Sequence, residues 1–185
     1  MDRRELVERA QRGDHEAFDV LARGTVARLD AAARLILRDS EWARDAVQDA
    51  YLRAWRDLPS LRDPDRFEAW LQRLLTNACR NQLRGRRRRP IEVELTAKID
   101  PPGPDAYSSG ADRDQLDRGF EHLQPEQRAV IVLHYYLGLP LPDAARALGI
   151  PLGTAKSRLH RAMRALRATL EIDDPPRSIA EGPVG

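Results

Sequence analysis

The chain has 185 residues, of which 42% are hydrophobic and only 5% aromatic, a balance that suits small helical units better than a β-sandwich. Its one cysteine, Cys79, excludes an intramolecular disulfide, and no segment has the apolar length of a signal peptide or a bilayer span, so we expect a soluble cytoplasmic protein. The net charge of +2 is segregated: basic residues outnumber acidic ones by 20 to 15 in residues 1–89 and by 7 to 2 in 122–170, whereas acidic residues dominate by 8 to 3 in 90–121 and by 4 to 1 in 171–185. Two basic blocks favour two polyanion-binding surfaces, with an unevenly charged solvated surface as the alternative.

The first domain, residues 1–88, is predicted to be helical throughout. Apolar residues recur at helical spacing in residues 15–37, although Gly24 weakens the middle of that segment, and again in 40–58 and 66–86. Ser40 is a plausible N-cap for the second of these helices. No segment alternates with period two, so we predict an all-α fold without a sheet.

A proline-bearing acidic segment, "PPGPDAYSSG" at 101–110, separates the two halves of the chain. We place a flexible linker at 89–112, a second helical domain at 113–171 and a disordered tail at 172–185. A linker of this kind predicts that the two domains of the free protein move independently unless a partner clamps them together.

The segment "LGIPLGTAKSRLHRAMRAL", residues 148–166, predicts a helix-turn-helix. A short helix at 142–148 and a turn at 149–153 precede a helix whose apolar stripe is formed by Ala155, Leu159, Ala162, Met163, Leu166 and Leu170. In a helix-turn-helix the second helix offers its N-terminal residues to the major groove, and Arg, Lys, Ser and Thr are suited to base edges and phosphates. The alternative is a surface helix with a basic face. The candidate DNA-contacting residues are Thr154, Lys156, Ser157, Arg158, His160, Arg161 and Arg164.

The span "QPEQRAVIVLHYYLGLPLPDAARALGIPLGTAKSRLHRAMRAL" resembles region 4 of the extracytoplasmic-function (ECF) group of bacterial sigma factors. The resemblance implies that this domain reads the −35 promoter element. The chain departs from the family pattern at 140–143, where Pro-Leu-Pro-Asp replaces the usual capping Ser or Thr and two acids. The resemblance therefore supports the reading of the DNA groove more strongly than it supports the capping of that helix.

The first domain resembles region 2 of the same family. "WARDAVQDAYLRAWRDL" is similar to region 2.2, which binds the clamp helices of the RNA polymerase β′ subunit. Leu52 and Trp55 lie outside the inward stripe, where large apolar groups suit a protein interface, whereas an ordinary core role fits Tyr51 better than Trp55. The candidate polymerase-binding residues are Asp45, Gln48, Asp49, Leu52, Arg53, Trp55 and Arg56.

"FEAWLQRLLTNACRNQLRGRRRR" resembles regions 2.3 and 2.4, which melt and read the −10 element. Unpaired bases are held by planar groups, amides and cations, and the arginine run at 86–89 suits phosphates. The family's base-holding loop maps onto 61–66, and Trp70 has a core role as its alternative. The candidate −10 residues are Arg62, Asp63, Arg66, Trp70, Arg73, Asn77, Arg80, Asn81 and Arg84.

The sequence contains no Cys/His metal spacing, glycine-rich phosphate loop or nucleophile–base pair, so we expect no metal, no cofactor and no enzymatic activity. The resemblance implies a promoter-specificity subunit whose partners are core RNA polymerase (β′ clamp helices and β flap), promoter DNA and an anti-sigma factor. Two alternatives are a helix-turn-helix regulator that does not join polymerase and a sequestering or adaptor protein on a sigma scaffold. Co-purification with core polymerase separates the three.

Overall fold

The structure, a computed structural model, describes residues 2–88 and 110–173, and the described residues contain no strand. The all-α prediction is confirmed. The predicted linker falls mostly outside the described residues, as do residues 174–185 of the predicted tail. The elements are α1 (Arg3–Gln11), α2 (His15–Arg23), α3 (Val26–Leu37), α4 (Ser40–Asp57), the 3₁₀ turns η1 (Leu58–Ser60) and η2 (Pro64–Arg66), α5 (Phe67–Arg88), α6 (Gly110–Glu121), α7 (Pro125–Ile131), the π-helical turn η3 (Val132–Tyr136), α8 (Leu141–Leu148) and α9 (Leu152–Asp173).

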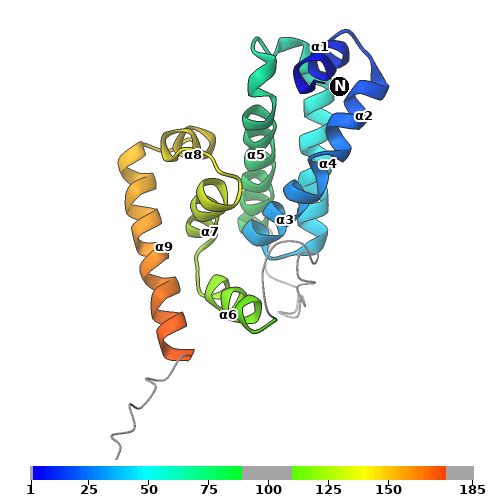
Figure 1. Cartoon of the computed structure of the whole chain (residues 1–185). Coiled ribbons are helices and arrows are strands. Elements are labelled where there is room, and N and C mark those ends of the chain that lie inside the picture. The colour runs from blue at the N-terminus through cyan, green and yellow to red at the C-terminus, as the bar shows by residue number, and fades with distance from the viewer. Residues whose placement is uncertain (1, 89–109, 174–185) are drawn as a thin grey trace, which may run out of the picture.

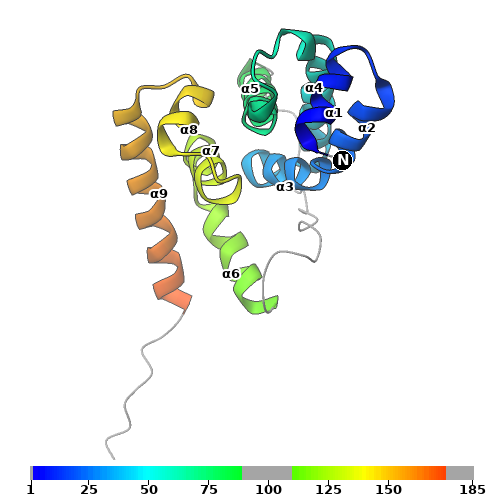
Figure 2. The same cartoon turned by 45° about the horizontal axis from the view of Figure 1, so that its top comes forward.

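The segment expected to form one helix over 15–37 is broken in two. α2 ends at Arg23 and α3 begins at Val26. Gly24 is a poor helix former, and the Thr25 hydroxyl donates to the carbonyl oxygen of Leu21 (2.9 Å) and shares a 2.8 Å hydrogen bond with the hydroxyl of Tyr51. The break lets α3 turn beneath α4 and α5 (Figures 1 and 2).

Two aspartates cap helices of the first domain. The Asp14 side chain accepts a hydrogen bond from the backbone N–H of Ala17 and Asp39 accepts one from Trp42, each 3.0 Å long. The Ser40 cap prediction is wrong by one residue, since Asp39 is the N-cap and Ser40 is the first residue of α4. A carboxylate satisfies the free N–H groups and also interacts favourably with the helix dipole.

α5 is the central helix of the molecule, with α4 on one side and the second domain on the other (Figure 1). The apolar residues that recur at helical spacing in this segment face the core: Phe67, Leu71, Leu75 and Ala78 are buried, and Leu74 and Leu83 are partly buried against the core. α5 thus joins the core of the first domain to the surface that faces the second.

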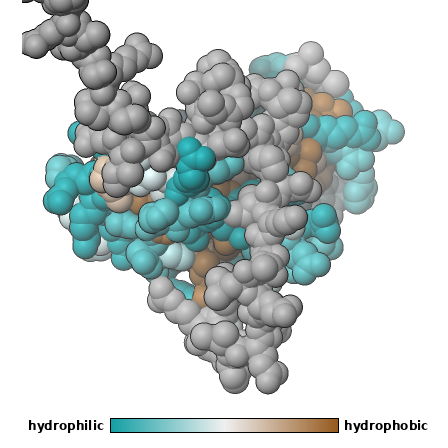
Figure 3. Space-filling view, turned by 90° about the horizontal axis from the view of Figure 1, so that it is seen from below, coloured by the Kyte–Doolittle hydropathy of each residue, from teal (hydrophilic) through white to brown (hydrophobic). Residues whose placement is uncertain are grey.

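In the second domain, α7 and α8 pack against α9, and α6 packs against the C-terminal half of α9. α6 begins at Gly110, inside the segment predicted to be linker. α8 begins after Pro140, whose side chain makes no capping hydrogen bond. The face seen in Figure 3 is mainly hydrophilic where it is described, with small apolar areas between the polar side chains.

Helices of the two domains are in contact with each other. α3 lies against α7 and η3, and α5 lies against α8. Arg128 of α7 donates from Nε to the carbonyl oxygen of Ile36 in α3 (2.9 Å), and Gln72 of α5 donates to that of Leu137 (3.5 Å). These contacts involve backbone carbonyl groups, which a hydrophobicity pattern cannot reveal.

Candidate nucleic-acid and protein interfaces

The turn before α9 fixes the helix-turn-helix geometry. Gly149 ends α8 in the left-handed conformation (φ 62°), and the backbone N–H of Ile150 donates to the carbonyl oxygen of Ala145 (3.1 Å). This is a common way to close a helix and turn the chain sharply, and it favours glycine. α9 then starts at Leu152, inside the segment predicted to be the turn.

The apolar stripe of α9 faces the domain core and therefore directs the basic face outward. Ala155, Ala162 and Leu166 are buried, and Leu159 packs against the core in part, whereas the side chain of Leu170 lies outside the described set. Of the candidate −35 residues, five are exposed and two, Thr154 and Arg158, are partly buried. The exposed ones are Lys156, Ser157, His160, Arg161 and Arg164.

Ser157 and Arg161 are held by their own helix. The Ser157 hydroxyl donates to the carbonyl oxygen of Thr154 (3.0 Å), and Arg161 donates from Nε to that of Ser157 (3.2 Å). Both bonds are exposed and local, and they leave the terminal nitrogens of Arg161 for another acceptor. The two residues are suited to exchange these bonds for contacts with base edges.

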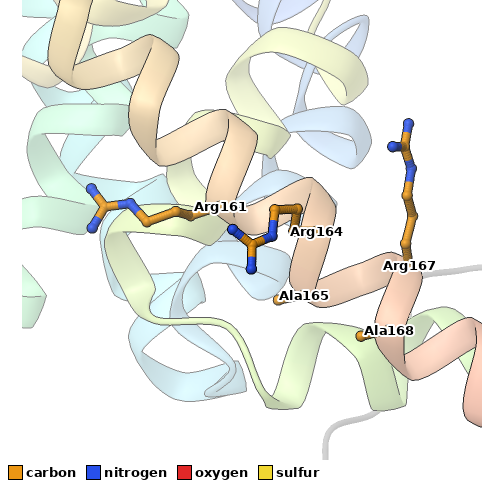
Figure 4. A pocket seen from close by; sticks show the side chains of 5 residues that line it. All are labelled: Arg161, Arg164, Ala165, Arg167 and Ala168. Carbon is orange, nitrogen blue, oxygen red and sulfur yellow. The ribbon is translucent and has the colours of Figure 1, made fainter.

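An open pocket on α9 includes one arginine that the sequence reasoning missed. Arg161, Arg164 and Arg167 line it with Ala165 and Ala168, and the Arg167 side chain extends away from those of Arg161 and Arg164 (Figure 4). Arg167 is exposed and follows Arg164 by three residues. Residues three apart are neighbours on a helix surface, so this spacing could have added Arg167 to the candidate residues. Cations repeated at one-turn intervals along a helix suit a phosphate backbone.

Five of the candidate −10 residues follow one another along α5. Arg73, Asn81 and Arg84 are exposed, and Asn77 and Arg80 are partly buried. Trp70, at the start of the same helix, is partly buried, with its ring 6.1 Å from that of Phe67 and tilted against it. Trp70 therefore packs at the edge of the core and also lies beside the candidate −10 residues of α5.

The loop before α5 is fixed by polar contacts. The Asp63 side chain accepts from the backbone N–H of Asp65 (3.1 Å) and lies 3.3 Å from Arg66, and Arg4 of α1 pairs with Asp65 (2.7 Å). Arg62, Asp63 and Arg66 all remain exposed. The loop thus presents both charges and backbone groups beside α5.

Arg80 stands apart from its neighbours on α5, because it faces the second domain. Its Nη1 lies 3.1 Å from the position that a Cβ atom on Gly149 would take. Burial, reinforced by the positive charges of Arg84 and Arg158, lowers the pKa of Arg80. The structure therefore brings one −10 candidate and one −35 candidate, Arg80 and Arg158, into the same electrostatic environment.

The outer face of α4 carries the residues predicted to bind polymerase. Leu52 is 64% exposed, far more than a leucine in a core, and Asp45, Gln48 and Arg56 are exposed near it. Asp49 and Arg53 form an ion pair of 2.9 Å along the helix. The result is an apolar side chain surrounded by charges, as in a protein-binding surface.

Trp55 is less available than expected. Its ring stacks on that of His15, with centroids 4.3 Å apart, and meets the edge of Phe18 at 5.1 Å. α2 therefore covers part of Trp55, a contact that no local pattern predicts because α2 and α4 are separated in the chain. Leu52 is the apolar group that α4 leaves exposed.

The described residues contain no group of three or more His, Cys, Asp or Glu side chains able to hold a metal ion. Burial raises the pKa of the Cys79 thiol to about 12, so it stays protonated at neutral pH. Among the described helices none is long and apolar enough to cross a membrane.

Comparison with known proteins matches both halves of the chain to one family. Residues 21–89 match "Sigma-70 region 2", and residues 113–166 match "Sigma-70, region 4". The RNA polymerase sigma-H factor of Pseudomonas aeruginosa is 30% identical, over 90% of this chain and 93% of its own length. The ECF RNA polymerase sigma factor SigM of Mycobacterium tuberculosis is 38% identical, over 85% of this chain and 79% of its own.

Two solved structures share the fold over both domains. CnrH, solved in complex with the cytosolic domain of CnrY, superposes with a TM-score of 0.65 at 31% identity, covering 93% of this chain and 99% of its own. RpoE of Bartonella quintana, solved with the anti-sigma factor NepR, gives 0.68 at 28% identity, covering 85% of this chain and 98% of its own.

Proposed function

This chain belongs to the ECF group of sigma-70 factors, which direct promoter-specific transcription initiation by RNA polymerase, and we propose that it does so through three separate surfaces. The outer face of α4 docks on core polymerase, the exposed face of α5 with its preceding loop reads the −10 element, and α9 reads the −35 element. The protein is not an enzyme, and its surfaces bind rather than react.

The polymerase-binding surface is centred on Leu52. Burying an exposed leucine within a ring of polar groups supplies affinity, and the surrounding charges set orientation. We assign the β′ clamp helices to this face and the β flap to the second domain, in keeping with the family resemblance.

The proposed promoter contacts are of two chemical kinds, contacts with bases and contacts with phosphates. On α9 we assign Ser157 and Arg161 to base edges and Lys156, Arg164 and Arg167 to phosphates, and the exposure of all five side chains supports this assignment. On α5, Asn77 and Asn81 offer amides for unpaired bases, Arg73 and Arg84 offer cations for phosphates, and Trp70 adds a planar edge.

We also propose a cytoplasmic protein with an anti-sigma partner. CnrH and RpoE are relatives by fold and sequence, and each was crystallised with a bound protein. A partner of that kind suits a chain whose two domains already lie together.

The exposure of Leu52 carries the proposal, and co-purification with core RNA polymerase tests it. Leu52→Ala should lower affinity for the core enzyme roughly tenfold or more, the effect of removing a central interface residue. Val20→Ala, which trims another exposed aliphatic side chain on α2, is the matched control and should bind as the wild type does. A wild-type chain that binds duplex DNA but never core polymerase would instead be a helix-turn-helix regulator.

A further inference from the structure

The loop that we assign to the −10 element, residues 61–66, is held at its start by one side chain of α1. Nε2 of Gln11 donates to the carbonyl oxygens of Leu58 (3.2 Å) and Leu61 (2.7 Å). A primary amide carries two N–H donors, so a single group can satisfy both acceptors. Leu58 begins η1 and Leu61 follows its last residue, so the two hydrogen bonds fix the direction in which the chain enters the loop.

Two ion pairs from the start of α1 reach the other end of the loop. Arg4 pairs with Asp65 in η2 (2.7 Å), and Arg3 pairs with Glu68 in the first turn of α5 (2.8 Å). Both pairs are open to solvent, where an ion pair contributes little to stability. The hydrogen bonds of Gln11 are partly buried, and a buried carbonyl group that loses its partner costs more free energy than an exposed ion pair supplies. Gln11 is therefore the stronger of the two attachments.

The core of the first domain fixes α1 itself. Arg4 and Gln11 are separated by about two helical turns, so they lie on the same face of α1 and about 10 Å apart along its axis. Between them Val7 is fully buried, and Leu6 and Ala10 are buried beside it. α1 lies beside the connection from α4 to α5 (Figure 1) and packs against η1 and η2 within it. It can therefore hold both ends of the loop from one fixed position.

Contacts within the loop set its shape but not its place on the domain. The Asp63 side chain accepts from the backbone N–H of Asp65 (3.1 Å), and the Asp63 carbonyl oxygen accepts from the backbone N–H of Arg66 (3.0 Å). These hydrogen bonds would move with the loop as a unit. The contacts with α1 attach that unit to the core that also holds α5, so they determine where the loop lies beside the −10 residues of α5.

We propose that Gln11 is a positioning residue for −10 recognition, which holds the backbone of the 61–66 loop in the place where an unpaired base is read. The inference rests on the proposed promoter function. An unpaired base is discriminated by hydrogen bonds to its edges, and a site that is loose by about 1 Å loses that discrimination. A loop that is already ordered also loses less conformational freedom when DNA binds. Gln11 therefore acts on the choice of base through the loop.

Transcription initiation by the holoenzyme, assembled from core polymerase and the full-length chain, tests the role of Gln11 on a promoter that carries each of the four bases in turn at each −10 position. Gln11→Leu keeps a good helix former of similar size but removes both donors. We expect the preference for the favoured base at one −10 position to fall roughly tenfold, while base preferences in the −35 element and affinity for core polymerase stay unchanged. Gln11→Lys supplies N–H donors again and should restore most of the preference. Arg12→Ala, at the exposed position that follows Gln11, is the control and should keep the wild-type preference.

The base preference is a ratio between DNA sequences initiated by one preparation of protein, so a misfolded fraction lowers initiation at every sequence and leaves the ratio unchanged. The role of Gln11 is wrong if Gln11→Leu keeps the wild-type ratio, even where total initiation falls, or if Gln11→Lys restores none of a lost preference. A wild-type chain that shows no base preference at any −10 position overturns the proposed function of α5 and its loop instead. The two failures are therefore distinguishable.

Discussion

Trp55 of α4 and His15 of α2 stack with their ring planes 29° apart, and this contact ties the first turn of α2 to the polymerase-binding helix. Leu52, one turn earlier on α4, has no such cover. The sequence pattern places Leu52 and Trp55 on the same face of the helix. In the structure Trp55 packs against α2, whereas Leu52 is exposed.

This difference predicts that alanine substitutions of the two residues affect different properties, protein stability for Trp55 and polymerase binding for Leu52. Trp55→Ala should lower the free energy of unfolding by about 2 kcal/mol, below the range for a fully buried tryptophan because part of the ring is exposed. Leu52→Ala should change stability by less than about 0.5 kcal/mol and act on polymerase binding alone. Urea denaturation of both variants makes the comparison, and equal losses of stability would show that Leu52 is a packing residue.

Gly149 is predicted to be intolerant of substitution. Gly149→Ala places a Cβ at positive φ and 3.1 Å from Arg80, so we expect a loss of roughly 1–2 kcal/mol. Gly153→Ala is the matched control, since nothing lies within 4 Å of its Cβ position and alanine is the better helix former. Thermal unfolding of the two proteins should give a lower Tm for the first and an unchanged or higher Tm for the second; the reverse order would contradict the turn geometry.

Much of this architecture follows from local pattern. The spacing of Phe67, Leu71, Leu75 and Ala78 predicts which side of α5 is buried, and the stripe that begins at Ala155 predicts the exposed basic face of α9. These predictions succeed because burial in a helix repeats with the helix period.

Sequence patterns do not predict contacts between segments that are distant in the chain. The cover of Trp55 depends on how α2 packs beside α4. Two of the domain contacts depend on Arg28 and Arg128, which donate to the backbone carbonyl oxygens of Tyr136 and Ile36. Gly24 in the sequence indicates a weak point in the helix. The hydrogen bond from the Thr25 hydroxyl to the carbonyl oxygen of Leu21, which accompanies the break, cannot be predicted from the sequence. Carbonyl acceptors are present at every residue, so the sequence does not mark which of them an arginine will reach.

The residues of α9 should separate into two energetic classes. Losing Arg161 should cost about 1–3 kcal/mol of binding to the preferred −35 element and relax specificity at one position. Losing Lys156 should weaken every sequence alike and reduce the salt dependence. Binding of Arg161→Ala and Lys156→Ala to single-base −35 variants at two salt concentrations distinguishes the classes; uniform weakening by both would reduce α9 to an electrostatic anchor.

Cys79 provides a reporter of unfolding in the native sequence. With burial raising its pKa to about 12, the thiol stays protonated near pH 8 and should react very slowly with a thiol reagent. Guanidinium should accelerate labelling in step with unfolding, because an exposed cysteine has a pKa of about 8.5. Stability contributed by burying the neutral thiol is present below that value and declines as pH rises toward 12. Rapid labelling of the native protein would contradict the buried position.

The most direct test of the central claim is transcription of total DNA from the source organism by core RNA polymerase, with and without this chain, followed by mapping of RNA 5′ ends. A sigma factor with two reading helices predicts new start sites that appear only with the chain and share a −35 and a −10 motif at fixed spacing. Start sites that are the same with and without the chain would contradict the account.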